Sequence, residues 1–383
     1  MVNRIVLNET SYFGRGSRAK LGDELKSRGY EKVLVVTDNT LMNSNVTKMV
    51  IDVLEINGIT YFVYLHVKPN PTVKNVQDGV MLAQISNVDA IVAVGGGSVI
   101  DTAKAISIII KNPEHSLVTS LDGVVNTRNK GLPLFALPTT AGTAAEVTIN
   151  YVITDENNMK KMVCVDVHDI PVCAIIDADL MQGMPQQLAA STGMDALTHA
   201  MEGYITKAGW LIPDMFHINA MALIYNNLEK AANEKDEVAV EKMSYAQYIA
   251  GMGFSNVGLG IVHSMAHSLG ALFDTPHGIA NAILLPHVLK FNGVVCPDLF
   301  RNMGNAIGLD MNNLTDEEAV GKVVEAVQNL SKKLNIPQTL REVGISKEMI
   351  PKLASQAIND ICTSGNPREV TVQDLINIYN EAF

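Results

Sequence analysis

Residues 90–104 read AIVAVGGGSVIDTAK, in which an apolar run passes through three glycines into a segment with helical spacing. Residues 90–94 are apolar without alternation, which is typical of a parallel strand covered by helices on both faces. Backbone N–H groups of the glycines and Ser98 could meet a pyrophosphate at the start of the following helix. The stretch therefore predicts a strand–turn–helix unit of a nucleotide-binding α/β domain.

This turn is a variant of the usual dinucleotide fingerprint. It is not G-x-G-x-x-G, and the acidic residue expected about 20 residues downstream of that fingerprint is absent. A plain tight turn with Ser98 as the helix N-cap is the alternative interpretation. Asp101 and Lys104, which follow within the same segment, modestly favour the nucleotide site.

Two further features favour a bound dinucleotide. Thr139, Thr140 and Thr143 lie in a loop after the apolar segment 132–138 and offer hydroxyls to a phosphate or ribose. Asp38 closely follows the apolar run 32–36. At this position a carboxylate can accept hydrogen bonds from ribose hydroxyls and repel a 2′-phosphate, which favours NAD over NADP. An N-cap role for Asp38 is equally compatible with the sequence.

The flanking sequence predicts two domains. Strand-like runs at 32–38, 60–67, 90–95, 132–140 and 171–177 alternate with helical patterns at 41–56 and 73–85, which indicates βαβ units. After residue 184 long helical patterns dominate, for example at 211–232 and 315–334. We predict a Rossmann-like α/β NAD-binding domain with a parallel sheet at 1–184 and an all-helical metal-binding and substrate domain at 185–383.

Composition excludes several classes of partner. The 383 residues carry a formal charge of −11 with no acidic or basic block, and this disfavours nucleic acid and anionic membranes as partners. No apolar run reaches the roughly 18 residues of a membrane span. The four cysteines form no C-x-x-C pair, and residues 1–10 lack the apolar core of a signal peptide. We expect a cytoplasmic protein.

Histidines cluster in the second half. His263 and His267 are four residues apart on a predicted helix, and His277 begins the next one. Asp195 and His199 have the same four-residue spacing on another helix. Imidazoles with one carboxylate suit Fe(II), Zn(II), Mn(II) or Ni(II). A lone D-x-x-x-H pair is more commonly structural. His287, beside Pro286, and the remaining dispersed histidines are treated as ordinary.

The sequence resembles the iron-activated, group III alcohol dehydrogenase family. The resemblance covers essentially the whole chain and rests on GGGSVIDTAK at 95–104, PTTAGTAAEVT at 138–148 and GLGIVHSMAHSLGALFDTPHG at 258–278. Within the family it is greatest to members that interconvert lactaldehyde and 1,2-propanediol, through segments such as GMGFSNVGLG and CTSGNPREVT. It implies NAD and Fe(II) as cofactors, with Zn(II) as the alternative metal.

The resemblance also implies roles for particular residues. The expected metal ligands are Asp195, His199, His263 and His277. The expected cofactor-binding residues are Asp38, Asn70, Gly97, Ser98, Thr139, Thr140, Thr143, Val152 and Lys161. His267 is expected near the nicotinamide, where it helps relay the proton, and the expected substrate pocket contains Asn150, Phe254 and Cys362. A homodimer is expected to form through the extended segment 3–8.

Three alternatives remain open. The chain could be another short-chain alcohol dehydrogenase or a zinc-dependent glycerol dehydrogenase of the same family. A non-redox lyase of the dehydroquinate-synthase type would need extra lysine and arginine to hold phosphate and carboxylate, and we see little such density. A non-catalytic binding protein is disfavoured because every expected ligand and both phosphate loops are present.

Overall fold

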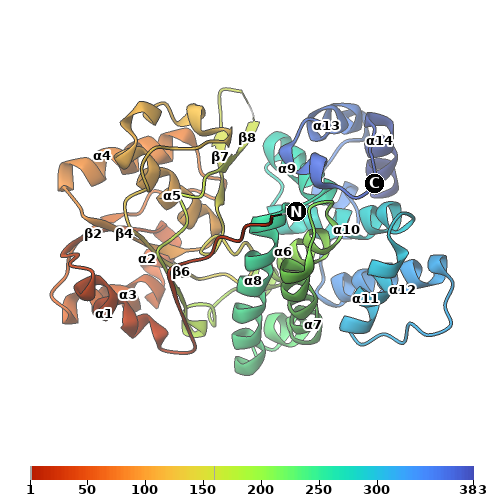
Figure 1. Cartoon of the computed structure of the whole chain (residues 1–383), viewed down its shortest axis with the longest axis horizontal. Helices are drawn as coiled ribbons and strands as arrows, with labels where there is room; N and C mark the ends of the chain where they lie inside the picture. The colour runs from red at the N-terminus through yellow and green to blue at the C-terminus, as the bar shows by residue number, and fades with distance from the viewer. Residues whose placement is uncertain (1, 159) are drawn as a thin grey trace. The chain divides into compact units, whose positions relative to one another are not determined.

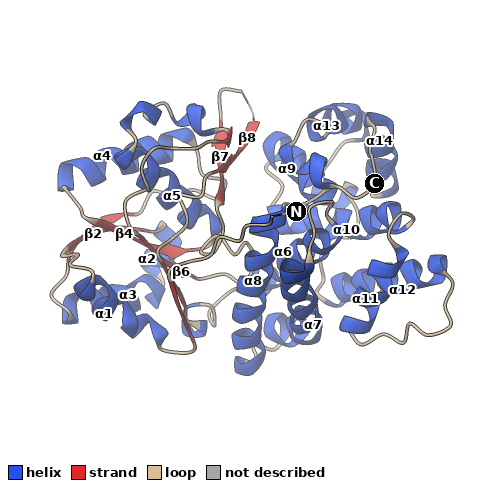
Figure 2. Cartoon of the chain, viewed as in Figure 1, coloured by secondary structure: helices blue, strands red, loops and turns tan. Residues whose placement is uncertain are grey.

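The computed structural model describes residues 2–158 and 160–383. The chain divides into two compact units, Met1–Met184 and Pro185–Phe383. Strands occur in the first unit, whereas the second is built from helices (Figure 2). This arrangement confirms the predicted combination of an α/β part and an all-α part.

The first unit is organised around a parallel sheet. Six strands of the described residues pair in the order β1-β9-β6-β4-β2-β3, and every neighbouring pair is parallel. The strands are β1 (Thr10–Phe13), β2 (Lys32–Val36), β3 (Thr60–Tyr64), β4 (Ala90–Gly95), β6 (Leu134–Pro138) and β9 (Cys173–Ile176). All of the predicted strand regions contribute a strand to this sheet.

Helices cover both faces of the sheet (Figure 1). Successive strand residues point to opposite faces, so Val33 and Val35 of β2 join one core while Leu34 and Val36 join the other. The first core is completed by α1 (Lys20–Ser27) and α3 (Asn45–Ile56), and the second by α4 (Val73–Ser86) and α5 (Gly97–Lys111). This two-sided burial explains the unbroken apolar runs.

The predicted cofactor loops lie next to each other because β4 and β6 are neighbours. Gly95 is in register with Pro138, so both strands end at the same level. The backbone N–H of Thr139 donates to the carbonyl of Gly95 at 3.1 Å. The carboxyl ends of adjacent parallel strands are the usual place for a ligand in such a sheet.

A buried lysine ties α5 to the segment after β6. The ammonium of Lys104 is fully buried and donates to the carbonyl of Thr148 at 2.6 Å, to its hydroxyl at 2.9 Å and to the carbonyl of Asn150 at 2.9 Å. Asp101, one turn earlier, accepts from the backbone N–H of Val152 at 3.0 Å. The polar residues of the GGGSVIDTAK segment thus hold the second loop and the strand that follows it.

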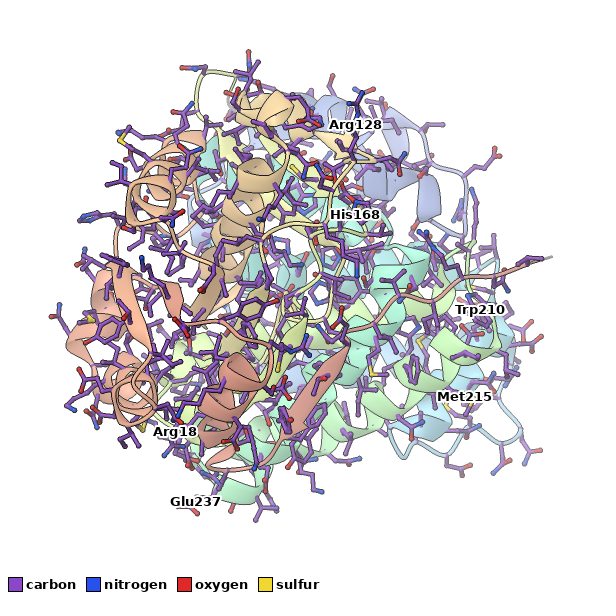
Figure 3. The ribbon with its side chains drawn as sticks, turned by 60° about the vertical axis from the view of Figure 1, so that its left-hand side comes forward. Arg18, Arg128, His168, Trp210, Met215 and Glu237 are labelled. Atoms are coloured by element: carbon purple, nitrogen blue, oxygen red, sulfur yellow. The ribbon has the colours of Figure 1, made fainter. Side chains whose placement is uncertain are left out.

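Ion pairs also join segments near the beginning and the end of the first unit. Arg18, labelled in Figure 3, donates to Asp177 at 2.7 Å and to Asp179 at 2.9 Å, which joins the turn before α1 to the segment after β9. Residues 3–8, all of them described, form no strand within the single chain.

Two details of the first unit differ from expectation. A second, three-stranded sheet contains β5 (Gly123–Val124), β7 (Asn150–Asp155) and β8 (Lys160–Val165), with β7 and β8 antiparallel. The helix predicted over 41–56 is broken into α2 (Asn39–Asn43) and α3. Ser44 adopts an extended conformation between them and caps α3, because a serine side chain can satisfy backbone N–H groups that a helix start leaves unpaired.

The second unit contains no strand in residues 185–383, all of which are described. Its α-helices are α6 (Gln186–Ile205), α7 (Leu211–Asn233), α8 (Glu237–Val257), α9 (Ile261–Phe273), α10 (His277–Gly293), α11 (Pro297–Ala306), α12 (Asp316–Lys333), α13 (Ile350–Ala357) and α14 (Val372–Glu381). Within the described part of the chain, every helix is too short or too polar to cross a membrane.

Candidate functional site

One face of α6 carries acidic and imidazole groups into the interior of the second unit. Asp195, His199 and Glu202 follow a spacing of four and then three residues, which places them on the same side of a helix. Their exposed fractions are 2%, 5% and 1%. Because burying charged and polar groups is costly without partners, this face predicts a polar centre built with neighbouring helices.

Histidines from α9 and α10 complete that centre. Ligand atoms of Asp195, His263 and His277 all lie within 4.8 Å of one another. The carboxylate oxygen Oδ1 of Asp195 is 3.9 Å from Nε2 of His263 and 3.6 Å from Nε2 of His277. Three of the four expected metal ligands are therefore brought together from three helices.

His199 lies beside this group rather than inside it. Its ring stacks on His263 with centroids 4.6 Å apart and on Phe254 with centroids 4.2 Å apart. The ring nitrogens of His199 are not part of the set that falls within 4.8 Å. The structure thus places the fourth expected ligand in contact with His263 through its ring face.

The electrostatics of the centre suit a cation. Burial, reinforced by neighbouring imidazoles, lowers the pKa of His263 well below its ordinary value. Burial has the same effect on the pKa of His277, although Asp195 opposes it. Both rings are therefore neutral near pH 7, and a neutral imidazole is the form that binds a metal. Two imidazoles and a carboxylate fit a divalent transition metal.

His267 lies one helical turn beyond His263 on α9. Its ring stacks on His277 with centroids 5.5 Å apart, and its Nδ1 is 2.8 Å from the carboxylate of Asp360. Burial would raise the pKa of Asp360, but the charge and hydrogen bond of His267 hold that pKa at about 2. Asp360 is therefore an ionised partner that orients the His267 ring.

The expected pocket residues fall in both units. Asn150 begins β7 in the first unit, and Phe254 stacks on His199 in the second. Cys362 follows Asp360 closely and donates its backbone N–H to the Asp360 carboxylate at 2.9 Å. Burial raises the pKa of the Cys362 thiol well above its ordinary value, so the thiol stays protonated.

Three polar residues at the centre were not anticipated from the sequence. Glu202 accepts from Nδ1 of His263 at 2.6 Å, Asn281 donates to Asp195 at 2.7 Å, and Asp360 contacts His267. Glu202 is seven residues after Asp195 and Asn281 is four after His277, so helical spacing could have indicated both. Asp360 is 93 residues from His267, and no local pattern connects them.

Burial raises the pKa of Glu202 to about 7, whereas hydrogen bonds from the backbone N–H groups of Val262, Gly260 and His263 lower it. The N–H of Val262 lies 2.7 Å from Oε1, and the N–H of His263 lies 3.4 Å from Oε2. With donors directed at both oxygens, the side chain acts as an acceptor, which is the role of a carboxylate.

The expected phosphate loops of the first unit pack closely. Gly97 is the first residue of α5, and Gly96 is its N-cap. A Cβ atom on Gly96 would lie 3.1 Å from Oγ1 of Thr140, and one on Gly97 would lie 2.7 Å from Cγ2 of Thr143. A side chain at Gly97 would force Thr143 to move, and one at Gly96 would fit only if Thr140 shifted slightly. Ser98 is the second residue of α5, and Thr139 follows β6.

The remaining expected cofactor residues lie at several points of the first unit. Asp38 caps α2 by accepting from the backbone N–H of Leu41 at 2.9 Å, which is the structural role that the sequence left open. The ammonium of Lys161 donates to the side chain of Asn70. Val152 directs its backbone N–H at Asp101.

Comparisons with known proteins agree with this arrangement. The family description "Iron-containing alcohol dehydrogenase" matches residues 8–178, and "Fe-containing alcohol dehydrogenase family, C-terminal" matches residues 189–383. Lactaldehyde reductase of Escherichia coli (strain K12) is 51% identical over 384 residues, with 100% of each chain covered. NAD-dependent methanol dehydrogenase of Bacillus methanolicus is 38% identical, covering 97% of this chain and 98% of that protein.

Solved structures show the same fold. The alcohol dehydrogenase from Oenococcus oeni superposes with a TM-score of 0.97 at 35% identity, and the match covers 100% of both chains. Both the sequence matches and the structural match extend across the two units. The chain therefore belongs to the iron-containing alcohol dehydrogenase family.

Proposed function

We propose that this chain is an NAD-dependent, iron-activated oxidoreductase that interconverts lactaldehyde and 1,2-propanediol. The observation that carries the proposal is the convergence of Asp195, His263 and His277, in a chain 51% identical over its full length to a lactaldehyde reductase. Neutral imidazoles beside a carboxylate suit a metal that activates a carbonyl oxygen.

The proposed metal ligands are Asp195, His199, His263 and His277. The first, third and fourth already converge, and His199 contacts His263 through its ring. Fe(II) is the proposed ion, and Zn(II) is the alternative with the same donor preference. When bound, such an ion supplies Lewis acidity toward the substrate oxygen.

The proposed NAD site lies in the first unit. Gly97 and Ser98 present the start of α5 to the pyrophosphate, and the loop with Thr139, Thr140 and Thr143 lies beside them. Asp38 is proposed to accept the ribose hydroxyls, which favours NAD over NADP. Asn70, Val152 and Lys161 are proposed to line the same site. When bound there, NADH would supply the hydride.

Proton transfer is assigned to His267. Asp360 holds its Nδ1, which leaves Nε2 to exchange a proton with the substrate oxygen directly or through water. The ring is held on its other side by stacking against His277. A histidine oriented in this way can act as donor in reduction and as acceptor in oxidation.

A short substrate is favoured by the surroundings of the metal ligands. Phe254 covers one face of His199, and the Cys362 thiol is protonated, so both present apolar or weakly polar surface. Together with Asn150 they are proposed to form the substrate pocket. The lyase alternative is disfavoured by the family match, which spans both units.

We further propose a cytoplasmic homodimer. The four cysteines are free thiols, as is usual in a reducing compartment. Residues 3–8 contain three consecutive apolar residues, Ile5, Val6 and Leu7, and this segment is proposed to pair with another subunit. The mass of the purified protein in solution, measured by light scattering, tests the assembly.

The activity can be tested by metal reconstitution. Chelator-stripped protein reloaded anaerobically with Fe(II) should oxidise NADH with lactaldehyde faster than with propanal or glyceraldehyde. If only Zn(II) restored activity, zinc would replace iron as the proposed metal. If another aldehyde were strongly preferred, it would replace lactaldehyde as the proposed substrate. Absence of NADH oxidation with every pair of metal and aldehyde would contradict the proposed function.

The two sites should respond separately to substitution. Gly97→Ala should weaken NADH binding about tenfold or more, because the new Cβ would lie 2.7 Å from Thr143 and displace that loop. Asp195→Ala should weaken metal binding by more than about 100-fold and leave NADH binding intact. The matched control is Gly183→Ala, since nothing lies within 4 Å of its Cβ. Loss of NADH binding in both glycine variants would refute the loop assignment.

Removal of the proton-transfer residue should slow the reaction without removing the metal. His267→Ala is expected to lower kcat by about 10² to 10⁴-fold, as is usual when a general acid or base is lost. His287→Ala is the control, because His287 lies on α10 near Glu381, 4.0 Å from its carboxylate. Metal content, kcat and its pH profile should be measured for both. An unchanged rate and profile in His267→Ala would rule out this role.

A further inference from the structure

Glu202 joins two of the helices that carry the proposed metal ligands. It lies on α6, three residues after His199, and its carboxylate meets the first turn of α9. Oε1 accepts from the backbone N–H of Val262 at 2.7 Å, and Oε2 accepts from the backbone N–H of His263 at 3.4 Å. A carboxylate is favoured at a helix N-terminus, where backbone donors are unpaired and the helix dipole is positive.

The same carboxylate contacts the His263 side chain. Oε2 of Glu202 is 2.6 Å from Nδ1, and both residues are almost fully buried, with exposed fractions of 1% and 2%. A short contact between a carboxylate and a ring nitrogen requires the nitrogen to carry the proton. In a neutral ring, Nε2 then holds the lone pair.

Asn281 supports this assignment independently. One of its side-chain atoms is 2.7 Å from Oδ1 of Asp195, and a carboxylate oxygen only accepts, so that atom is the amide nitrogen. The same nitrogen lies 3.3 Å from Nε2 of His263. It lies closer, at 3.1 Å, to Nε2 of His277. The amide nitrogen carries two N–H groups and no acceptor lone pair, so a proton on Nε2 of His263 would face another donor, whereas a lone pair there would not.

We propose that Glu202 is a positioning residue that fixes the tautomer and orientation of His263 so that Nε2 is available to a metal ion. This inference rests on the proposed metal site and adds a residue to it that makes no contact with the metal. In other metal sites, loss of such an outer partner lowers metal affinity by about 10 to 100-fold.

The substitution Glu202→Gln tests whether Glu202 fixes the tautomer of His263 or only fills space between the helices. Glutamine has nearly the same shape but only one acceptor oxygen. If that oxygen meets the N–H of Val262, the amide NH₂ faces Nδ1 of His263 and favours the proton on Nε2, which blocks ligation. In the other orientation the NH₂ faces the N–H of Val262, and α9 must shift.

The experiment measures Zn(II) affinity of the metal-stripped full-length protein by competition with a chromophoric chelator, because Zn(II) is not oxidised during the titration. Glu202→Gln should bind Zn(II) about 10 to 100-fold more weakly than the wild type. The control is Ser244→Ala, a buried change on α8 where the hydroxyl donates to the carbonyl of Glu241 on the same helix, and it should bind within about twofold of the wild type. Thermal unfolding of each metal-free variant reports any loss of folding.

Asp195→Ala distinguishes failure of this inference from failure of the proposed function. If wild type and Asp195→Ala bind Zn(II) equally, the proposed metal site is wrong. If Asp195→Ala loses binding but Glu202→Gln keeps wild-type affinity, the role of Glu202 alone is wrong.

A second measurement needs no variant at Glu202. Protein with ¹⁵N-labelled histidine, assigned by comparison with His263→Gln, should show the proton of His263 on Nδ1 in the wild type. A proton on Nε2 would overturn the inference even if Glu202→Gln did not fold.

Discussion

The second unit depends on burying the polar face of α6. Asp195, His199 and Glu202 are almost fully enclosed, although carboxylates lose much hydration energy when they leave water. Their partners come from α9 and α10, whose first turns supply His263 and His277 together with backbone donors. The packing of these three helices is therefore set by polar pairing as well as by apolar contact, and it leaves ligand atoms of Asp195, His263 and His277 within 4.8 Å of one another.

Small residues make this close approach possible. A Cβ on Gly260, the N-cap of α9, would lie 2.8 Å from the Glu202 carboxylate, and one on Gly278 would lie 2.3 Å from the backbone carbonyl of Ser191 on α6. His217 fits its buried ring against Gly203 and Gly253 in the same way. The glycines thus let α7, α9 and α10 pack closely against α6, and let α7 pack closely against α8.

The parts of the fold and of the candidate site that depend on local sequence patterns could be predicted from the sequence. Unbroken apolar runs predicted the parallel sheet, and four-residue spacings placed Asp195 and His199 on one helix and His263 and His267 on another. The break at Ser44 was missed because apolar spacing continues through it, whereas the cap depends on a single side chain. The contact of Asp360 with His267 joins residues 93 positions apart, and only the packed structure brings them together.

The two units use opposite physical means to prepare for a ligand. In the first, Gly96 and Gly97 leave the backbone of the β4–α5 turn without side chains, so N–H groups at a helix start are available to an anion. In the second, neutral imidazoles and a carboxylate are held by hydrogen bonds from residues such as Asn281, so lone pairs are available to a cation. An added carbon at Gly97 would press against the Thr143 side chain, whereas a lost partner in the polar network would leave a buried group unpaired. A small change is therefore expected to damage each site for a different reason. In the first unit it is an added methyl group, and in the second it is an oxygen exchanged for nitrogen.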